Sequence, residues 1–440
     1  MKLGKIIVCF LLGCIVSGYF FPFGFTFLPA SLNTKQIIGV IGIMAFLYNS
    51  IRTKTFNMSW MTIGSALIAV IFSVWCYFSI VANNTNDTTY AEYWVSFAVW
   101  LGGAYGVVSL LKAYHGSFNL QRLTNYLAGV CTVQCFLALA IDHFPGFQAF
   151  VDSFIQQGQA FFQEINRMYG IGCALDPAGV RFSIVLVMIA HQIGNNKRVT
   201  DREGAIWGYL ILYAIITVVG NMISRTTIVG SAMGIVYMFL LLGFPKRGFI
   251  NARQMRFYGI FLSIIIAATV ISVIMYRISP DFRDNIRFAF EGFFNYAEKG
   301  EWSTGSTDKL KDVMWIWPDT FRGWMIGNGL FGGWVYSTDI GYCRFTLYCG
   351  LIGLSIFSAF FIYNGLVVRR KFTNFTLMSL MLISLTFVIW IKVATDIFLI
   401  NALLFCIDGD YDEEGNEIDP YIDPELQLSR HFKTPGPQLL

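Results

Sequence analysis

The sequence predicts an all-α protein that crosses a membrane many times. Of its 440 residues, 55% are hydrophobic and only 13% are charged, whereas a soluble domain carries about 25% charged residues. The 42 Phe, 21 Tyr and 11 Trp residues supply more apolar surface than one soluble core can bury. Long apolar runs recur along the whole chain. These observations exclude a soluble enzyme, a disordered regulator and a nucleic-acid-binding protein.

Apolar runs of about 18 or more residues predict membrane-crossing helices, because about 20 helical residues span the hydrocarbon core. Twelve runs fit this pattern, at residues 5–22, 36–51, 60–82, 92–111, 121–141, 177–195, 204–223, 226–244, 257–276, 342–366, 375–391 and 393–407. The first run continues past Cys14 to Phe21, which favours a membrane helix over a cleaved signal peptide. The last two runs are short, and only Lys392 separates them, so they form either two spans or one broken helix.

The loop cations predict the orientation, since cytoplasmic loops are enriched in Lys and Arg. With a cytoplasmic N-terminus, the cytoplasmic loops hold sixteen cations: Lys2, Lys5, Arg52, Lys54, Lys112, Arg122, Lys197, Arg198, Arg202, Lys246, Arg247, Arg253, Arg256, Arg369, Arg370 and Lys371. The opposite short loops and helix rims hold Lys35, Arg167, Arg181, Arg225, Arg344 and Lys392. Both termini are therefore predicted to be cytoplasmic.

The chain divides into a predicted transmembrane domain, residues 1–408, and an acidic, disordered cytoplasmic tail, residues 409–440. Two longer segments face the other side of the membrane. Residues 142–176 contain an apolar pattern of Phe147, Phe150, Phe154, Phe161 and Ile165, which predicts helices lying along the membrane surface. Residues 277–341 open with an amphipathic pattern from Phe282 to Ala297, in which Arg283, Arg287 and Glu291 form an i, i+4 ladder.

Ionisable residues inside or at the rim of apolar spans cost several kcal/mol and are candidate functional groups. Four cations of this kind lie near the outward-facing leaflet: Arg181, Arg225, Arg344 and Lys392. Lys392 and Asp396 are spaced to pair on one helix face. One explanation is that these cations extend to lipid headgroups. The alternative is a binding site for an anionic, lipid-anchored ligand, because guanidinium groups form charge-assisted, bidentate bonds to phosphate.

No metal site is predicted. The alternating carboxylates Asp408, Asp410 and Asp412 lack the glycine of a calcium loop, and Glu413 stands in its place. A solvated acidic tail explains them better. His115, His143, His191 and His431 are isolated from one another. No cofactor is predicted either.

Three outward segments resemble the Wzy-type O-antigen polymerases and the related O-antigen ligases. The first runs from Arg167 through Gly170 to Asp176-Pro177. The second is the Ser224-Arg225 turn between two spans. The third comprises Gly327-Asn328-Gly329, the stretch from Ser337 to Phe345, and Gly350 to Leu354. The resemblance covers most of residues 160–400, and the order and sidedness of the segments make it more specific than any one of them.

The resemblance implies a GT-C-like, metal-independent glycosyltransferase of the bacterial inner membrane. Such a polymerase joins undecaprenyl-diphosphate-linked repeat units into an O-antigen, capsule or exopolysaccharide at the periplasmic face. Its expected partners are the lipid-linked donor and acceptor, membrane lipids and a chain-length regulator protein, and not nucleic acid. Two features depart from the family: Ala178 follows the proline, and residues 277–341 contain no histidine. The missing histidine favours a polymerase over a ligase that transfers the glycan to lipid A-core. A lipid-linked oligosaccharide flippase is the alternative from another class.

Glycosyl transfer from a lipid diphosphate requires cations at the leaving group and, for the acceptor hydroxyl, a base. Arg225 is the main candidate for the diphosphate, and the further candidates are Arg167, Arg181, Arg283, Arg287, Arg344 and Lys392. The candidate bases are Asp339, Glu291 and Asp176, in that order, although Asp339 has the alternative role of holding Arg344. Aromatic residues of the late loop are suited either to stack on sugars or to anchor the interface; they are Trp315, Trp317, Trp324, Trp334 and Tyr336.

Overall fold

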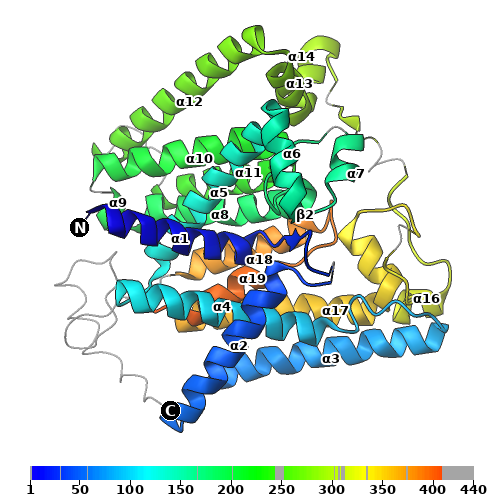
Figure 1. Cartoon of the computed structure of the whole chain (residues 1–440). Coiled ribbons are helices and arrows are strands. Elements are labelled where there is room, and N and C mark those ends of the chain that lie inside the picture. Colours follow the sequence, from blue (N-terminus) through cyan, green and yellow to red (C-terminus); the bar gives the residue numbers. More distant parts are fainter. Residues whose placement is uncertain are drawn as a thin grey trace.

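The protein is a bundle of long helices, shown by a computed structural model (Figure 1). The structure describes residues 2–29, 31–56, 58–165, 167–200, 202–242, 252–301, 303–305, 308, 313–332, 335–372 and 375–408. The predicted tail at 409–440 and Trp334 lie outside the described residues.

Every predicted span coincides with a helix of the bundle. These helices are α1 (Lys2–Phe20), α2 (Thr34–Thr53), α3 (Trp60–Asn83), α4 (Tyr93–His115), α5 (Leu120–His143), α8 (Leu175–Asn195), α10 (Glu203–Ile223), α11 (Thr227–Leu242), α12 (Ala252–Ile278), α17 (Gly341–Lys371), α18 (Thr376–Ile389) and α19 (Phe398–Cys406). In the described chain, eight helices are long and apolar enough to cross a membrane. The protein is therefore an all-α, multi-pass membrane protein, and the total of twelve spans stays a prediction.

Side-chain caps explain where several of these helices begin. Asn33 caps α2 and forms a capping box with Gln36, while Ser59 and Asn119 cap α3 and α5. Each cap satisfies backbone N–H groups that the first helical turn leaves without partners. These polar residues therefore fix helix starts that hydropathy alone locates only approximately.

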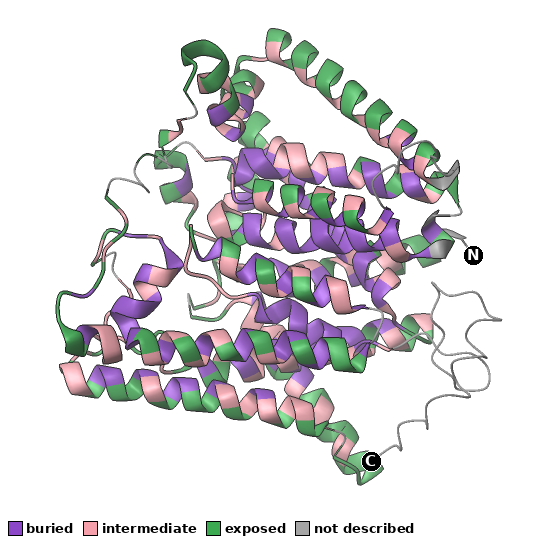
Figure 2. Cartoon of the chain, turned by 180° about the vertical axis from the view of Figure 1, so that it is seen from behind, coloured by how far each residue is buried: buried purple, intermediate pink, exposed green. Residues whose placement is uncertain are grey.

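Helix α8 is the centre of the bundle and α12 lies at its edge. The apolar window of α8 is 89% buried, against 11% for α12. Helix α8 packs against α5, α10, α11 and α18. Figure 2 shows buried residues concentrated in the central helices and exposed residues along α12. Because α8 carries Asp176 and Arg181, these charges lie on the most enclosed element of the fold.

Both ends of the described chain lie at the same end of the bundle. The Tyr114 hydroxyl donates to the Lys5 carbonyl at 3.5 Å, and Lys112 forms an ion pair with Asp408 at 2.7 Å. The Phe118 amide also donates to Asp408, at 3.1 Å. We call this end the terminal end, at the left of Figure 1, and the opposite end the distal end.

The distal end carries the shorter elements of segments 142–176 and 277–341. They are α6 (Pro145–Phe154), α7 (Gln159–Glu164), α13 (Pro280–Ala289), α14 (Glu291–Lys299) and α16 (Phe321–Ile326). Strand β1 (Gly24–Phe25) pairs antiparallel with β2 (Ile155–Gln156). The four-residue helix α9 (Lys197–Thr200) is not part of these segments and lies between α8 and α10 in the chain. Phe150, Phe154 and Phe161 are exposed on α6 and α7, as expected for helices on a membrane surface.

The predicted Arg287–Glu291 ladder is wrong. Helix α13 ends at Ala289 and α14 begins at Glu291, because Phe290 leaves helical geometry at φ −118° and ψ 30°. Without a continuous helix the two side chains do not share a face. Arg287 instead forms an ion pair with Glu298, in which its Nη2 atom donates to both carboxylate oxygens, at 2.8 and 2.9 Å.

A break in α17 accommodates the predicted glycine motif. Gly350 has φ 69° inside the helix, which frees the carbonyls of Leu347 and Tyr348 to accept the amides of Asn328 and Gly329, at 2.6 and 3.0 Å. A Cβ atom on Gly350 would lie 2.2 Å from the Met325 carbonyl oxygen. Glycine is required here because the two backbones touch and because φ is positive.

Candidate functional site

Arg225 lies at the distal end, in the short turn between α10 and α11. Its Nη2 atom is 2.6 Å from Oε2 of Glu291, the first residue of α14. The two side chains are 17% and 30% exposed, so the ion pair is only partly solvated. The ion pair between Glu291 and Arg225 thus connects segment 277–341 to the turn between α10 and α11.

Phe288 of α13 brings two arginines together. The guanidinium carbons of Arg167 and Arg225 lie 3.7 and 3.9 Å from the centroid of its ring, within cation–π range. Burial lowers the pKa of Arg167, and the positive charge of Arg225 lowers it further. Burial also lowers the pKa of Arg225, while Glu291 opposes that shift. Two like charges held half-buried favour an anion that carries more than one negative charge.

Lys392 takes part in a second, adjacent set of polar contacts. Its Nζ atom is 3.1 Å from Oδ1 of Asp176 and 2.9 Å from the Thr226 hydroxyl. The hydroxyls of Ser224 and Thr226 both donate to the same Asp176 oxygen. The start of α8, the Ser224–Thr226 turn and the segment after α18 are therefore joined at one carboxylate.

The predicted pair between Lys392 and Asp396 is wrong. Residues 390–397 are not helical, so an i, i+4 spacing does not place them on one face. Asp396 instead accepts the Phe398 amide at 3.1 Å, at the start of α19. The same non-helical segment separates α18 from α19, which are two helices and not one.

Asp339 lies beside this network, just before α17. Burial raises its pKa, and the negative charge of Asp176 raises it further against the opposing charges of Arg344 and Lys392. Its carbonyl accepts the Ala394 amide at 3.0 Å. Arg344 donates to the Phe331 carbonyl at 2.6 Å, and its guanidinium carbon lies 3.9 Å from the Phe331 ring centroid. Asp339 is thus a partly buried carboxyl group whose affinity for a proton exceeds that of an ordinary aspartate.

Arg181 lies deeper, on α8. Its guanidinium carbon is 5.6 Å from the Phe21 ring centroid, and its buried Nε atom has no hydrogen-bond partner. The charges of Arg181 and Lys35 both act on Asp396. Lys35 donates to the Ser96 hydroxyl at 2.7 Å and lies 4.4 Å from the Trp100 ring centroid. This deeper set carries two cations and one carboxylate.

Several of these residues were missed by the sequence reasoning. Lys35 was counted only as a rim cation, and Phe288 and Thr226 were not singled out. The sequence does point to Lys35, because Lys35 and Arg181 both lie close to the start of an apolar run. The contacts of Phe288 and Thr226 join segments far apart in the chain and leave no local pattern.

Two predicted cations lie apart from the cluster. Arg283 is exposed, and its guanidinium carbon lies 5.7 Å from the Tyr276 ring centroid. Arg287 donates to the Tyr276 hydroxyl at 3.0 Å and pairs with Glu298. In this arrangement neither faces Arg225.

Three of the predicted aromatics form a ladder in segment 277–341. The rings of Trp315 and Trp317 are 5.9 Å apart, and Trp317 stacks on Trp324 at 5.3 Å. The neighbouring Met314 and Ile316 pack instead with the buried Ile340. Tyr336 accepts from the Asn328 amide at 3.2 Å. Trp315 and Trp317 are exposed.

A polar cavity of about 230 Å³ adjoins Arg167. Asp142, Gln148, Gln163 and Tyr169 contribute to its lining. Gln148 donates to the Tyr169 hydroxyl at 3.1 Å, and Asp142 accepts from Asn285 of α13 at 2.9 Å. The cavity therefore offers hydrogen-bond donors and acceptors next to the arginine pair.

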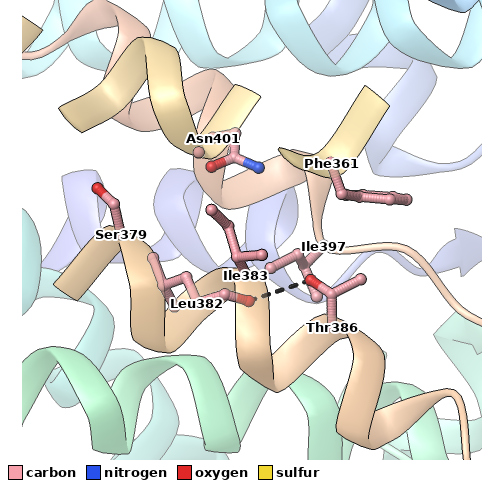
Figure 3. A pocket seen from close by; sticks show the side chains of 8 residues that line it. Phe361, Ser379, Leu382, Ile383, Thr386, Ile397 and Asn401 are labelled. Carbon is pink, nitrogen blue, oxygen red and sulfur yellow. Dashed lines mark hydrogen bonds between the residues drawn. The ribbon is translucent and has the colours of Figure 1, made fainter. Parts of the chain in front are cut away.

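A second space, between α17, α18 and α19, has no such capacity. Figure 3 shows its lining, where the Thr386 hydroxyl donates to the Leu382 carbonyl at 3.1 Å. It leaves no room for a water molecule. It is a packing gap and not a ligand site.

The segments 167–177, 224–226 and 337–345 meet at the distal end. Asp176 of the first binds the Ser224 and Thr226 hydroxyls of the second. The charge of Asp176 also acts on Asp339 of the third. Among the described residues, no group of three or more His, Cys, Asp or Glu side chains is arranged to hold a metal. No family model, curated protein or solved structure matches the chain.

Proposed function

We propose that the protein polymerises undecaprenyl-diphosphate-linked repeat units into a surface polysaccharide at the periplasmic face of the bacterial inner membrane. The observation that carries the proposal is the cluster at the distal end, where Arg167 and Arg225 come from segments that resemble Wzy-type polymerases and Lys392 pairs with Asp176 of the first of these segments. In this proposal the distal end is periplasmic, the termini are cytoplasmic, and the fold is a GT-C-like arrangement of twelve spans.

Arg167 and Arg225 bind the donor diphosphate. Guanidinium groups bond phosphate oxygens in a bidentate manner, and two of them neutralise the charge that develops as the diphosphate leaves. Glu291 occupies Arg225 in the structure, so we expect the donor diphosphate to displace it. This pairing makes Glu291 a weaker candidate for the base than Asp339.

Asp339 accepts the proton of the acceptor hydroxyl. The hydroxyl oxygen bonds to the anomeric carbon of the donor, the bond from that carbon to the diphosphate breaks, and undecaprenyl diphosphate departs. Burial raises the pKa of Asp339, which makes its carboxylate a stronger proton acceptor than that of an ordinary aspartate. Lys392 holds Asp176 beside it.

Two further features are suited to sugars. The cavity beside Arg167 presents amide, carboxylate and phenol groups to sugar hydroxyls, and the ring faces of Trp315 and Trp317 suit stacking on a pyranose.

The glycan profile of a deletion strain tests the proposal. Loss of a polymerase leaves single repeats on the core, whereas loss of a ligase leaves none, and a flippase defect leaves lipid-linked units on the cytoplasmic side. Single repeats on the core, restored to a ladder by the wild-type gene, are the expected result. A bare core or an unchanged ladder would contradict it.

A further inference from the structure

A cavity of about 720 Å³ opens at the terminal end, away from the candidate site. It lies between α2, α3, α4, the end of α17 and residues 405–408, which comprise the end of α19 and the two residues after it. Its size falls within the range of small-molecule binding sites. None of the residues assigned above to donor or acceptor lines it, so its role is separate from the proposed function.

The space arises because two consecutive helices pack against different neighbours. Helix α2 packs on α4, while α3 packs mainly on α17. The Tyr363 hydroxyl of α17 donates to the Met61 carbonyl at 3.0 Å, which fixes the start of α3 to α17. Figure 1 shows α2 and α3 diverging from the loop that joins them. The cavity is therefore a groove built into the helix arrangement.

The lining changes from apolar to charged along the groove. Ile43, Phe97 and Leu101 line its deep part, nearer the distal end, and Lys112 and Lys371 line its mouth at the terminal end, together with Ser59, Thr62, Ser109 and Asp408. A membrane ligand that fits such a gradient has an apolar chain and a polar headgroup. The headgroup then belongs to the leaflet at the terminal end.

The charges at the mouth select an anionic headgroup. Lys112 pairs with Asp408 at 2.7 Å, and these side chains are 34% and 37% exposed. The Lys371 ammonium donates to the carbonyls of Phe405 and Ile407, at 2.7 and 3.0 Å. An ammonium has three hydrogens, so these two bonds leave one for a ligand. Among the described lining residues, two cations against one carboxylate leave a surplus of one positive charge.

We propose that this groove binds one anionic glycerophospholipid, with its phosphate at Lys371 and Lys112 and one acyl chain extending along α4 towards Phe97. The single negative charge of a phosphodiester matches the surplus at the mouth. The lipid joins the α2–α4 pair to the α3–α17 pair and braces the end of α19, which Lys371 already holds through two carbonyls.

Native mass spectrometry of the purified full-length protein, mixed with phosphatidylglycerol or with phosphatidylcholine, tests the proposal. We expect one phosphatidylglycerol to be retained per chain and phosphatidylcholine to be retained about tenfold less, because charge-assisted bonds to the phosphate are lost in competition with its own ammonium. Lys371→Met should weaken phosphatidylglycerol retention about tenfold, whereas Arg369→Met, an exposed cation on the same helix end, should not. Equal retention of both lipids, or no effect of Lys371→Met, would overturn the proposal.

A groove-filling variant tests the acyl chain separately. Ala98 lines the groove, and Ala98→Trp should abolish retention, while Val133→Trp on the exposed face of α5 should not. If the tryptophan variant does not fold, Ala98→Leu takes its place. Leucine fills less of the groove and perturbs folding less, and this variant should reduce retention. Unchanged retention in the folded Ala98 variants would overturn the proposal. Displacement of phosphatidylglycerol by equimolar undecaprenyl phosphate would also overturn it. So would a dimer that carries no lipid, because a second copy of the chain would then fill the groove.

Discussion

The two ends of the bundle carry cations of the same chemical types in different surroundings. At the terminal end Arg52, Lys54, Arg369 and Arg370 project into solvent. At the distal end Arg225 and Lys392 are less than one third exposed and each contacts a carboxylate. An exposed cation costs little and serves topology, whereas a partly buried one persists only with a partner. Burial and carboxylate partners therefore distinguish Arg225 and Lys392 from these four exposed cations.

Arg225→Ala gives the largest expected effect. Polymerisation should fall by about 10³-fold or more, because a preorganised group that stabilises transition-state charge is lost. Arg225→Lys should recover little, because an ammonium lacks the bidentate fork. The measurement is the length distribution of surface glycan in a complemented deletion strain at equal protein level. A full glycan ladder from Arg225→Ala would contradict the claim that the partly buried cations of the distal end carry the function.

Asp339→Asn should lower polymerisation by about 10²-fold or more, because the amide cannot accept a proton. The pH profile sharpens this prediction. Burial and Asp176 raise the pKa of Asp339, so wild-type activity should fall as the pH drops through that raised value, where the carboxylate becomes protonated. The acidic limb should disappear in the residual activity of Asp339→Asn. An identical limb in the variant would assign the titration to another group.

Asp176→Asn tests whether the distal ion pairs also stabilise the fold. The change weakens the contacts of Lys392, Ser224 and Thr226 together, so the free energy of unfolding should fall by about 1–2 kcal/mol. Thermal unfolding in detergent measures it. The matched control is Glu298→Gln, which removes the partner of Arg287 at side-chain exposures of 40% and 46% and should lower the free energy of unfolding less than Asp176→Asn does, because exposed ion pairs contribute little. A larger loss of unfolding free energy for Glu298→Gln than for Asp176→Asn would contradict this prediction.

Arg370→Ala should have the smallest effect. The side chain is exposed at the terminal end, where one cation among many sets orientation. Glycan length and protein level should both match the wild type. A loss of polymer with normal protein level would place function at the terminal end.

The sequence predicted the helices well and the distal cluster in part. Apolar runs located every long helix because membrane spans impose a length and a hydropathy that neighbouring residues reveal. Arg225 and Lys392 were found because charges are rare in such runs. Glu291 and Asp176 were also named, as candidate bases, but their pairing with these cations was not predicted: Asp176 reaches Lys392 across 216 residues of sequence, and no local rule predicts that contact.

Both wrong predictions came from assuming an unbroken helix. The Arg287–Glu291 and Lys392–Asp396 pairs each need four residues of continuous α-helix, and breaks at Phe290 and at residues 390–397 remove it. Neither break lies at a proline or a glycine, so composition gave no warning. These breaks matter because they turn Glu291 to Arg225 and Lys392 to Asp176.

Polymerisation by the purified protein in liposomes, supplied with purified lipid-diphosphate repeat units, tests the central claim most directly. The account predicts a ladder of products with release of lipid diphosphate for the wild type, and neither for Arg225→Ala at equal protein. No products from the folded wild type, or equal ladders from both proteins, would contradict it.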